Sequence, residues 1–216
     1  MDLPVWQALY AELRDKNFEI VAVAQDSGGV KAAGEWIVAA SPEYTVLIDE
    51  SHRVSKLYNM VNVPTGVWID ESGTIVRPGE VAFADDRFRE FSGHDSAPYL
   101  DALRDWVAQG ERSSYVMSEP ARREKLAVHD PALPLAAAEF GLAEHLYQSG
   151  YLTEAIAHFK EAQRLNPKSW NYKRQAYALS DAERDYETTF AREVKKIGGG
   201  KRYYPPPALP GYQVKV

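Results

Sequence analysis

The apolar positions of residues 1–50 alternate between helical and strand spacing. Residues 6–13 carry apolar side chains every three or four positions, which predicts a helix with one buried face. Residues 18–24 (FEIVAVA) form a short run rich in branched side chains, which predicts a buried strand. The same two patterns then repeat, as a helical stripe over 30–40 and a strand over 44–48.

The next sixty residues predict a short helix, a β-hairpin and a longer helix. Apolar residues of 54–58, Leu57 among them, share one helical face. Strands over 66–69 and 74–76 flank the turn sequence Asp-Glu-Ser-Gly, which is typical of a hairpin. A helical stripe over 99–107 follows. The resulting order, α-β-α-β-α-β-β-α, predicts an α/β fold.

The second half of the chain has a different character. Residues 111–134 are polar and interrupted by prolines, and we interpret them as a linker with one helix near 122–126. Residues 135–197 are rich in alanine and predict helices, including a single one over 181–197. Residues 198–216 combine glycines and prolines, which excludes regular helix and predicts an extended tail laid on the surface by its tyrosines.

Composition restricts the classes of protein to consider. The 216 residues include 25 Lys and Arg against 31 Asp and Glu, a net charge of −6 that argues against general binding to nucleic acid or to anionic membranes. No apolar run approaches the roughly 18 residues of a membrane span, and the N-terminus lacks the basic start and apolar core of a signal peptide. These features predict a soluble, cytoplasmic chain.

The chain contains no cysteine, which excludes disulfides, thiolate metal sites and thiol catalysis by these residues. The glycine-rich stretches do not match a phosphate-binding loop. We expect neither a metal nor a cofactor, because the histidines lack the spacing of metal ligands. These histidines are His52, His94, His129, His145 and His158. The tryptophans, Trp36 among them, lie on apolar stripes and are expected in the core.

The run Pro64 to Ile75 (PTGVWIDESGTI), preceded by FEIVAVAQD and by a strand ending in VLIDE, resembles the thioredoxin fold. More narrowly, residues 2–108 resemble the TlpA/ResA-like and alkyl hydroperoxide reductase/thiol-specific antioxidant (redoxin) branch. Residues 1–110 are accordingly expected to form a thioredoxin-like domain. In that family an Asp closes the inserted strand, here Asp49, and a Tyr ends the helix before the turn, here Tyr58.

The resemblance also implies a site. In the family the proline that begins the hairpin is in the cis form, so we predict a cis Val63–Pro64 peptide bond. The loop Val63, Pro64 and Thr65 is then the candidate substrate-binding site, where backbone groups of the residue before proline pair with an extended partner chain. No catalytic residue is assigned within the chain.

The sequence departs from the family where the redox chemistry resides. The first, central strand and the Trp-Cys-x-x-Cys motif at its end have no counterpart, and Asp2-Leu3-Pro4 resembles the segment just after that motif. Three explanations stay open: a start placed too late, a selenocysteine codon read as a stop, or a paralogue that lost the site. We expect a gap between the strands near 18–24 and 66–70, with Ile20, Val21, Val67 and Ile69 partly uncovered.

Residues 139–167 resemble one tetratricopeptide repeat, with Gly150 at the interhelix turn and small residues where two helices approach closely. The alternative is an ordinary helical hairpin. A tetratricopeptide-like region over 135–197 implies contact with a protein partner. One repeat cannot bury its own faces, so we expect it to pack partly on the first half.

Taken together, the resemblances imply a thiol–disulfide oxidoreductase or antioxidant protein that is redox-inactive as written. Its partners would be protein thiols, disulfides or peroxide in a longer form, which could be periplasmic or membrane-anchored. The alternative function is a redox-dead scaffold that binds protein partners through the cis-proline groove and the helical repeat.

Overall fold

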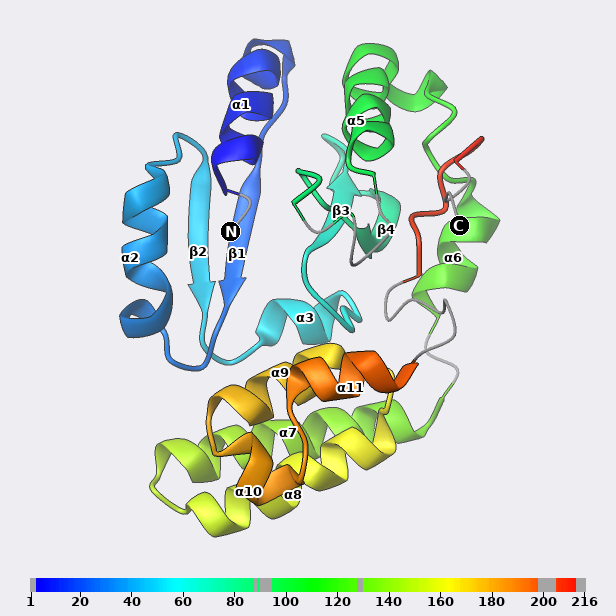
Figure 1. Cartoon of the computed structure of the whole chain (residues 1–216). Helices are drawn as coiled ribbons and strands as arrows, with labels where there is room; N and C mark the ends of the chain where they lie inside the picture. Colours follow the sequence, from blue (N-terminus) through cyan, green and yellow to red (C-terminus); the bar gives the residue numbers. More distant parts are fainter. Residues whose placement is uncertain (1–2, 88, 90–94, 128–129, 198–204, 213–216) are drawn as a thin grey trace.

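The computed structural model describes residues 3–87, 89, 95–127, 130–197 and 205–212. The N-terminal half is a mixed α/β arrangement and the C-terminal half is helical (Figure 1). The elements of the first half are α1 (Leu3–Leu13), a 3-10 turn (Arg14–Lys16), β1 (Val21–Gln25), α2 (Val30–Ala40), β2 (Thr45–Asp49), α3 (Arg53–Leu57), β3 (Thr65–Ile69), β4 (Ile75–Val81) and α5 (Ala97–Gln109).

A second 3-10 turn (Gly110–Arg112) and α6 (Glu119–Leu126) connect the two halves. The helical half then consists of α7 (Ala132–Gln148), α8 (Leu152–Leu165), α9 (Trp170–Ala178), α10 (Ala182–Tyr186) and α11 (Phe190–Ile197). The single helix expected over 181–197 is therefore wrong. The chain breaks at Glu187, whose left-handed backbone (φ 56°) ends α10 and redirects the chain toward α11.

The strands form two separate pairs. β1 runs parallel to β2, from Val21 opposite Thr45 to Gln25 opposite Asp49. β3 runs antiparallel to β4 and follows directly after the candidate loop. Figure 1 shows β1 and β2 beside α2, and β3 and β4 below α5. The expected lack of pairing between the strands near 18–24 and 66–70 is confirmed, because β1 and β3 belong to different sheets.

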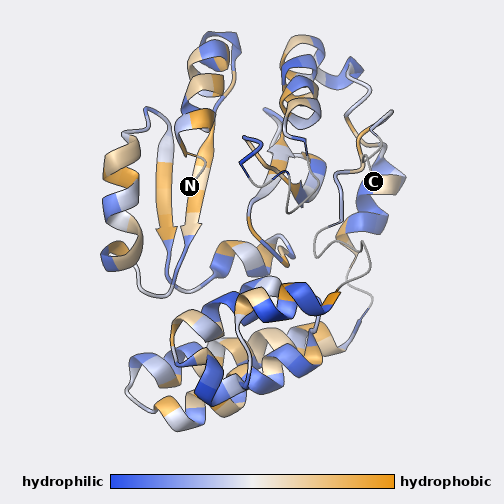
Figure 2. Ribbon diagram, viewed as in Figure 1, coloured by the Kyte–Doolittle hydropathy of each residue, from blue (hydrophilic) through white to orange (hydrophobic). Residues whose placement is uncertain are grey.

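The strand pair β1–β2 is poorly covered. No residue of either strand is buried, although Figure 2 shows both as hydrophobic. Val21 is 58% exposed and Ile69, on β3, is 42% exposed, as expected for strands that flank a gap. Ile20 and Val67 are likewise only half-buried. Parallel strands are normally covered on both faces, so this pair lacks part of the packing that its composition suits.

The core of the first half lies between α1, α5 and the β3–β4 pair. Trp68 is its centre: its indole Nε1 donates to the Tyr99 hydroxyl over 2.9 Å, and its ring stacks on Trp106 with centroids 5.0 Å apart. Gly66 allows this approach, because a Cβ there would lie 2.3 Å from the Tyr99 hydroxyl. Two side chains that were expected to be buried are exposed. Leu57 is 78% exposed and Trp36 55% exposed, since no described element covers their faces.

The core of the helical half lies between α7 and α8. The turn between these helices passes through Gly150, whose positive φ of 87° favours glycine. Small residues let the two helices approach closely, as the repeat-like pattern predicted. The buried positions include Ala143, Ala155 and Ala162, together with Phe140 and Phe159.

Candidate functional site

The candidate loop lies where α3 passes into β3. The Val63–Pro64 peptide bond is cis, as predicted from the sequence. Val63, Pro64 and Thr65 are all half-buried. The Pro64 carbonyl accepts from the amide of Ala82 over 3.3 Å, which attaches the loop to the end of β4.

Asn62, which is 1% exposed, organises this loop from within. Its side-chain oxygen accepts the Val63 amide over 2.9 Å, and its carbonyl accepts the Thr65 hydroxyl over 2.6 Å. The Val63 amide, expected to be offered to a partner chain, therefore already has an acceptor. An extended partner that pairs with this amide would have to replace the Asn62 side chain.

The N-terminal end of α9 binds the segment before the loop. The backbone amides of Trp170 and Asn171 both donate to the Val61 carbonyl, over 2.7 and 3.1 Å. The Asn171 side chain donates to the Met60 carbonyl over 2.9 Å. The first amides of a helix have no partner within it, so the Val61 carbonyl satisfies a need of the helix while fixing the loop. The helical half thus positions the candidate loop.

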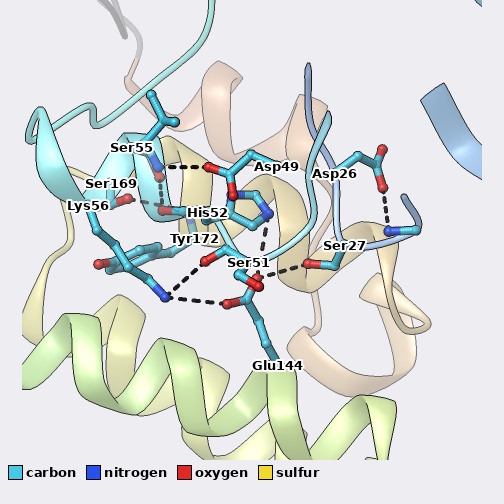
Figure 3. Close-up of polar contacts among 12 residues, drawn as sticks. Asp26, Ser27, Asp49, Ser51, His52, Ser55, Lys56, Glu144, Ser169 and Tyr172 are labelled. Atoms are coloured by element: carbon cyan, nitrogen blue, oxygen red, sulfur yellow. Dashed lines mark hydrogen bonds and ion pairs between the residues drawn. The ribbon is translucent and has the colours of Figure 1, made fainter. Parts of the chain in front are cut away.

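A second polar group joins the two halves at the ends of β1 and β2 (Figure 3). We call Ser27, His52, Lys56 and Glu144 the Glu144 cluster. Glu144, on α7, is 5% exposed and accepts the Ser27 hydroxyl over 2.9 Å. The Lys56 ammonium and the His52 Nε2 each lie 3.6 Å from its carboxylate. Burial raises the pKa of Glu144 above that of a free glutamate.

His52 is held at the edge of this cluster in an unusual backbone conformation, with φ of 51°. It is 3% exposed, and its ring meets the Phe140 ring edge-on with centroids 5.5 Å apart. No described residue forms a well-directed hydrogen bond with either ring nitrogen. Burial lowers the pKa of His52, which favours the neutral imidazole.

The Glu144 cluster ties the two halves together. The Ser27 hydroxyl, just after β1, donates to the Glu144 carboxylate of α7, and His52 and Lys56 lie within ion-pair distance of the same carboxylate. Next to the cluster, Asp49 has a structural role, because its side chain accepts the Val54 amide over 2.7 Å at the start of α3. Ser27 follows β1 and His52 follows β2, so the segments after the carboxyl ends of both strands contact α7.

The described residues contain no group of three His, Asp or Glu side chains able to hold a metal ion. His158 pairs with Glu139 over 2.6 Å, and His145 is exposed. His94 and His129 lie outside the described residues.

Sequence reasoning missed the Glu144 cluster. One signal was available: Glu144 lies four residues after Phe140 and next to Ala143, on the helix face that small and aromatic residues assign to the core. Nothing in the sequence indicated that Ser27 and His52 would face it, because that depends on how the two halves pack.

Comparison with protein-family models, with curated proteins and with solved structures finds no match. None of the helices in the described ranges is long and apolar enough to cross a membrane.

Proposed function

We propose that this chain is the scaffold of a thioredoxin-like (redoxin/TlpA-like) thiol–disulfide oxidoreductase or antioxidant protein. One observation carries the proposal: a parallel pair, β1–β2, and an antiparallel pair, β3–β4, stand apart with no strand between β1 and β3 among the described residues. A single strand added there, parallel to β1 and antiparallel to β3, would join the two pairs into one mixed sheet.

The chemistry of this proposal requires a thiol or selenol from outside these 216 residues, since they contain no cysteine. The chain contributes the rest of the arrangement. The loop at Val63, Pro64 and Thr65 begins β3, beside the edge that an added strand would occupy. The substrates proposed for the completed site are protein thiols or disulfides, or peroxide.

The test adds the proposed strand. Three extended chains are compared: one with a six-residue apolar strand and Cys-x-x-Cys before Met1, one with the same strand and Ser-x-x-Ser, and one with Gly and Ser only. The chain by itself should not reduce insulin disulfides or peroxide above the thiol background. Both strand-bearing chains should unfold at clearly higher temperature, because the strand adds ladder hydrogen bonds and core. Only the Cys-x-x-Cys chain should show turnover.

Equal melting temperatures for all three extended chains would reject the proposed sheet and with it the oxidoreductase. Turnover by the Ser-x-x-Ser chain would instead show that another group does the chemistry.

The second candidate function is a redox-dead scaffold that binds protein partners through the cis-proline groove and the helical repeat. The contact of α9 with residues 60–62 favours it, because the helical half and the loop form one continuous structure. A monomeric chain that melts at the same temperature with and without the added strand would support this second function.

A further inference from the structure

The C-terminal residues 205–212, which we call the tail segment, lie on the α/β half of the molecule. Their exposure alternates: Pro207 and Leu209 are buried, whereas Ala208 and Pro210 are exposed. This period of two is that of an extended chain with one face turned inward. Tyr212 packs against the core, while Tyr203 and Tyr204 lie outside the described residues. The sequence predicted that tyrosines hold the tail on the surface. Within the tail segment the buried residues are Pro207 and Leu209.

A buried ion pair on β4 binds the backbone of Ala208 at two points. The Arg77 guanidinium donates to the Ala208 carbonyl over 2.7 Å, and the Glu80 carboxylate accepts the Ala208 amide over 3.2 Å. Arg77 is 2% exposed and Glu80 8% exposed, so the two charged side chains lie away from water and the contacts with exposed Ala208 are partly buried. Charge-assisted hydrogen bonds of this kind are the stronger ones in proteins.

The pair is fixed in place by groups other than the tail segment. Arg77 donates to Glu80 over 2.9 Å and to the Tyr115 carbonyl over 2.6 Å, and its guanidinium lies 5.4 Å from the Trp68 ring centroid. Lys125, on α6, forms an ion pair with Glu80. Tyr115 and Lys125 come from residues 111–134, which the sequence pattern predicts to be a linker. The site is therefore ordered by contacts that do not involve residue 208.

The sequence of the tail segment suits such a site. Residues 205–207 and 210 are prolines, so Ala208 and Leu209 carry the only backbone amides between 205 and 210. This limits the register in which an amide can reach Glu80. Leu209, 6% exposed, inserts into the core that contains Trp68 and Leu103. A proline-rich chain is already extended before it binds, which reduces the entropy lost on docking.

We propose that Arg77 and Glu80 form a recognition site for an extended proline-rich peptide of the type Pro-Ala-Leu-Pro, which the tail segment occupies in cis. The ion pair binds the backbone of the alanine, and the core residues around Leu209 contact the leucine side chain. The partner that fits this surface is a protein carrying such a segment. This interaction goes beyond the proposed oxidoreductase scaffold and does not depend on it.

Because the tail segment already occupies the site, a separate peptide binds more weakly. A tethered segment competes at an effective concentration on the order of millimolar, so a free peptide at micromolar concentration cannot displace it. The test therefore releases the tail segment within the full chain. Ala208→Pro removes the amide that Glu80 accepts, and Pro206→Ala, at an exposed position, is the matched control.

The probe is a fluorescein-labelled peptide, Pro-Pro-Pro-Ala-Leu-Pro-Gly-Tyr, measured by fluorescence anisotropy. We expect it to bind A208P in a 1:1 complex at least tenfold more tightly than it binds the wild-type chain or P206A. Leu209→Ala, which releases the tail segment by a different contact, should behave as A208P does. Far-ultraviolet circular dichroism identifies the variants that keep the fold.

Two further comparisons test which groups do the binding. A peptide with proline in place of its alanine should bind A208P at least tenfold more weakly, because it lacks the recognised amide. Arg77→Lys in the A208P chain should weaken binding similarly, since lysine keeps the charge but lacks the planar guanidinium that donates to Glu80, Tyr115 and the alanine carbonyl from separate nitrogens. Equal binding to wild type and A208P, equal binding of the two peptides, or no binding to folded A208P or L209A would overturn the proposal.

Discussion

At the scale of single residues, three buried charged or titratable groups determine how distant segments meet. Arg77 and Glu144 each contact several segments that are far apart in sequence. His52 differs, because its buried ring lacks well-directed hydrogen bonds. Burial of this imidazole favours its neutral form, so acidification should weaken the junction between the two halves at His52.

The contribution of His52 to stability should therefore decrease as the pH falls below about 6.5, the pKa of histidine in an unfolded chain. Burial lowers the pKa of His52 in the folded state, so the unfolded state binds the proton more readily. Asp26, Asp49, Lys56, Gln175 and Glu144 face this ring. The raised pKa of Glu144 acts in the opposite direction.

His52→Asn isolates the effect of the imidazole, because asparagine tolerates the left-handed backbone and keeps Glu144 in place. Urea unfolding at pH 7.5, 6.5 and 5.5 gives the free energy of unfolding of both chains. The advantage of wild type over H52N should shrink on acidification, by no more than about 1.4 kcal/mol per pH unit. An advantage that grows instead would mean that protonated His52 gains an ion pair with Glu144.

At the scale of elements, the main feature is the open side of β1 and β3. Each strand pairs with a single neighbour among the described residues, so each leaves one row of backbone groups without a ladder. Such edges attract further strands, from another segment or another chain. Exposed apolar side chains on both strands strengthen this tendency: Val21, on β1, is 58% exposed and Ile69, on β3, is 42% exposed.

Amide hydrogen exchange followed by NMR should show protection that alternates residue by residue along Val21–Gln25, whose register with β2 is regular. Alternate amides face the paired neighbour and are slow to exchange, whereas the others face the open side and should be at least tenfold faster. The Met117 amide, which donates to the Val76 carbonyl of β4 over 3.1 Å, serves as the protected reference. Uniform slow exchange along β1 would show that another strand covers it.

At the scale of the whole molecule, the helical half and the α/β half share contacts at α9 and at the Glu144 cluster. The contact at α9 adjoins the candidate loop, because residues of α9 form hydrogen bonds with Met60, Val61 and Asn62. We therefore expect the two halves to unfold together and not as independent domains. This matches the sequence-based expectation that a lone repeat-like hairpin packs partly on its neighbour.

Asn171→Ala removes the side-chain donor to the Met60 carbonyl and should reduce the free energy of unfolding by about 1–3 kcal/mol. Gln148→Ala, at an exposed position, is the control and should change it by less than about 0.5 kcal/mol. Circular dichroism at 222 nm and tryptophan fluorescence should follow one shared transition in both variants. Separate transitions for the two signals in wild type would contradict the coupling of the halves.

Local pattern in the sequence determined the elements of this protein. β1, β2 and β3 appear within about three residues of the predicted apolar runs, whereas β4 extends five residues beyond the predicted end at 76. The hairpin turn and the Gly150 turn lie where glycine permits a backbone that other residues resist. The cis Val63–Pro64 bond and the separation of β1 from β3 were expected through family resemblance.

Only the tertiary structure decided which polar groups face one another. Arg77 and Ala208 are 131 residues apart, and Ser27 and Glu144 are 117 apart. Neither pair shares an element, so no periodicity connects them. Trp36 and Leu57 show the same limit for apolar residues, because a stripe predicts an inward face only if another element arrives to cover it. Periodicity acts over a few residues, whereas burial and charge pairing depend on the packing of the entire chain.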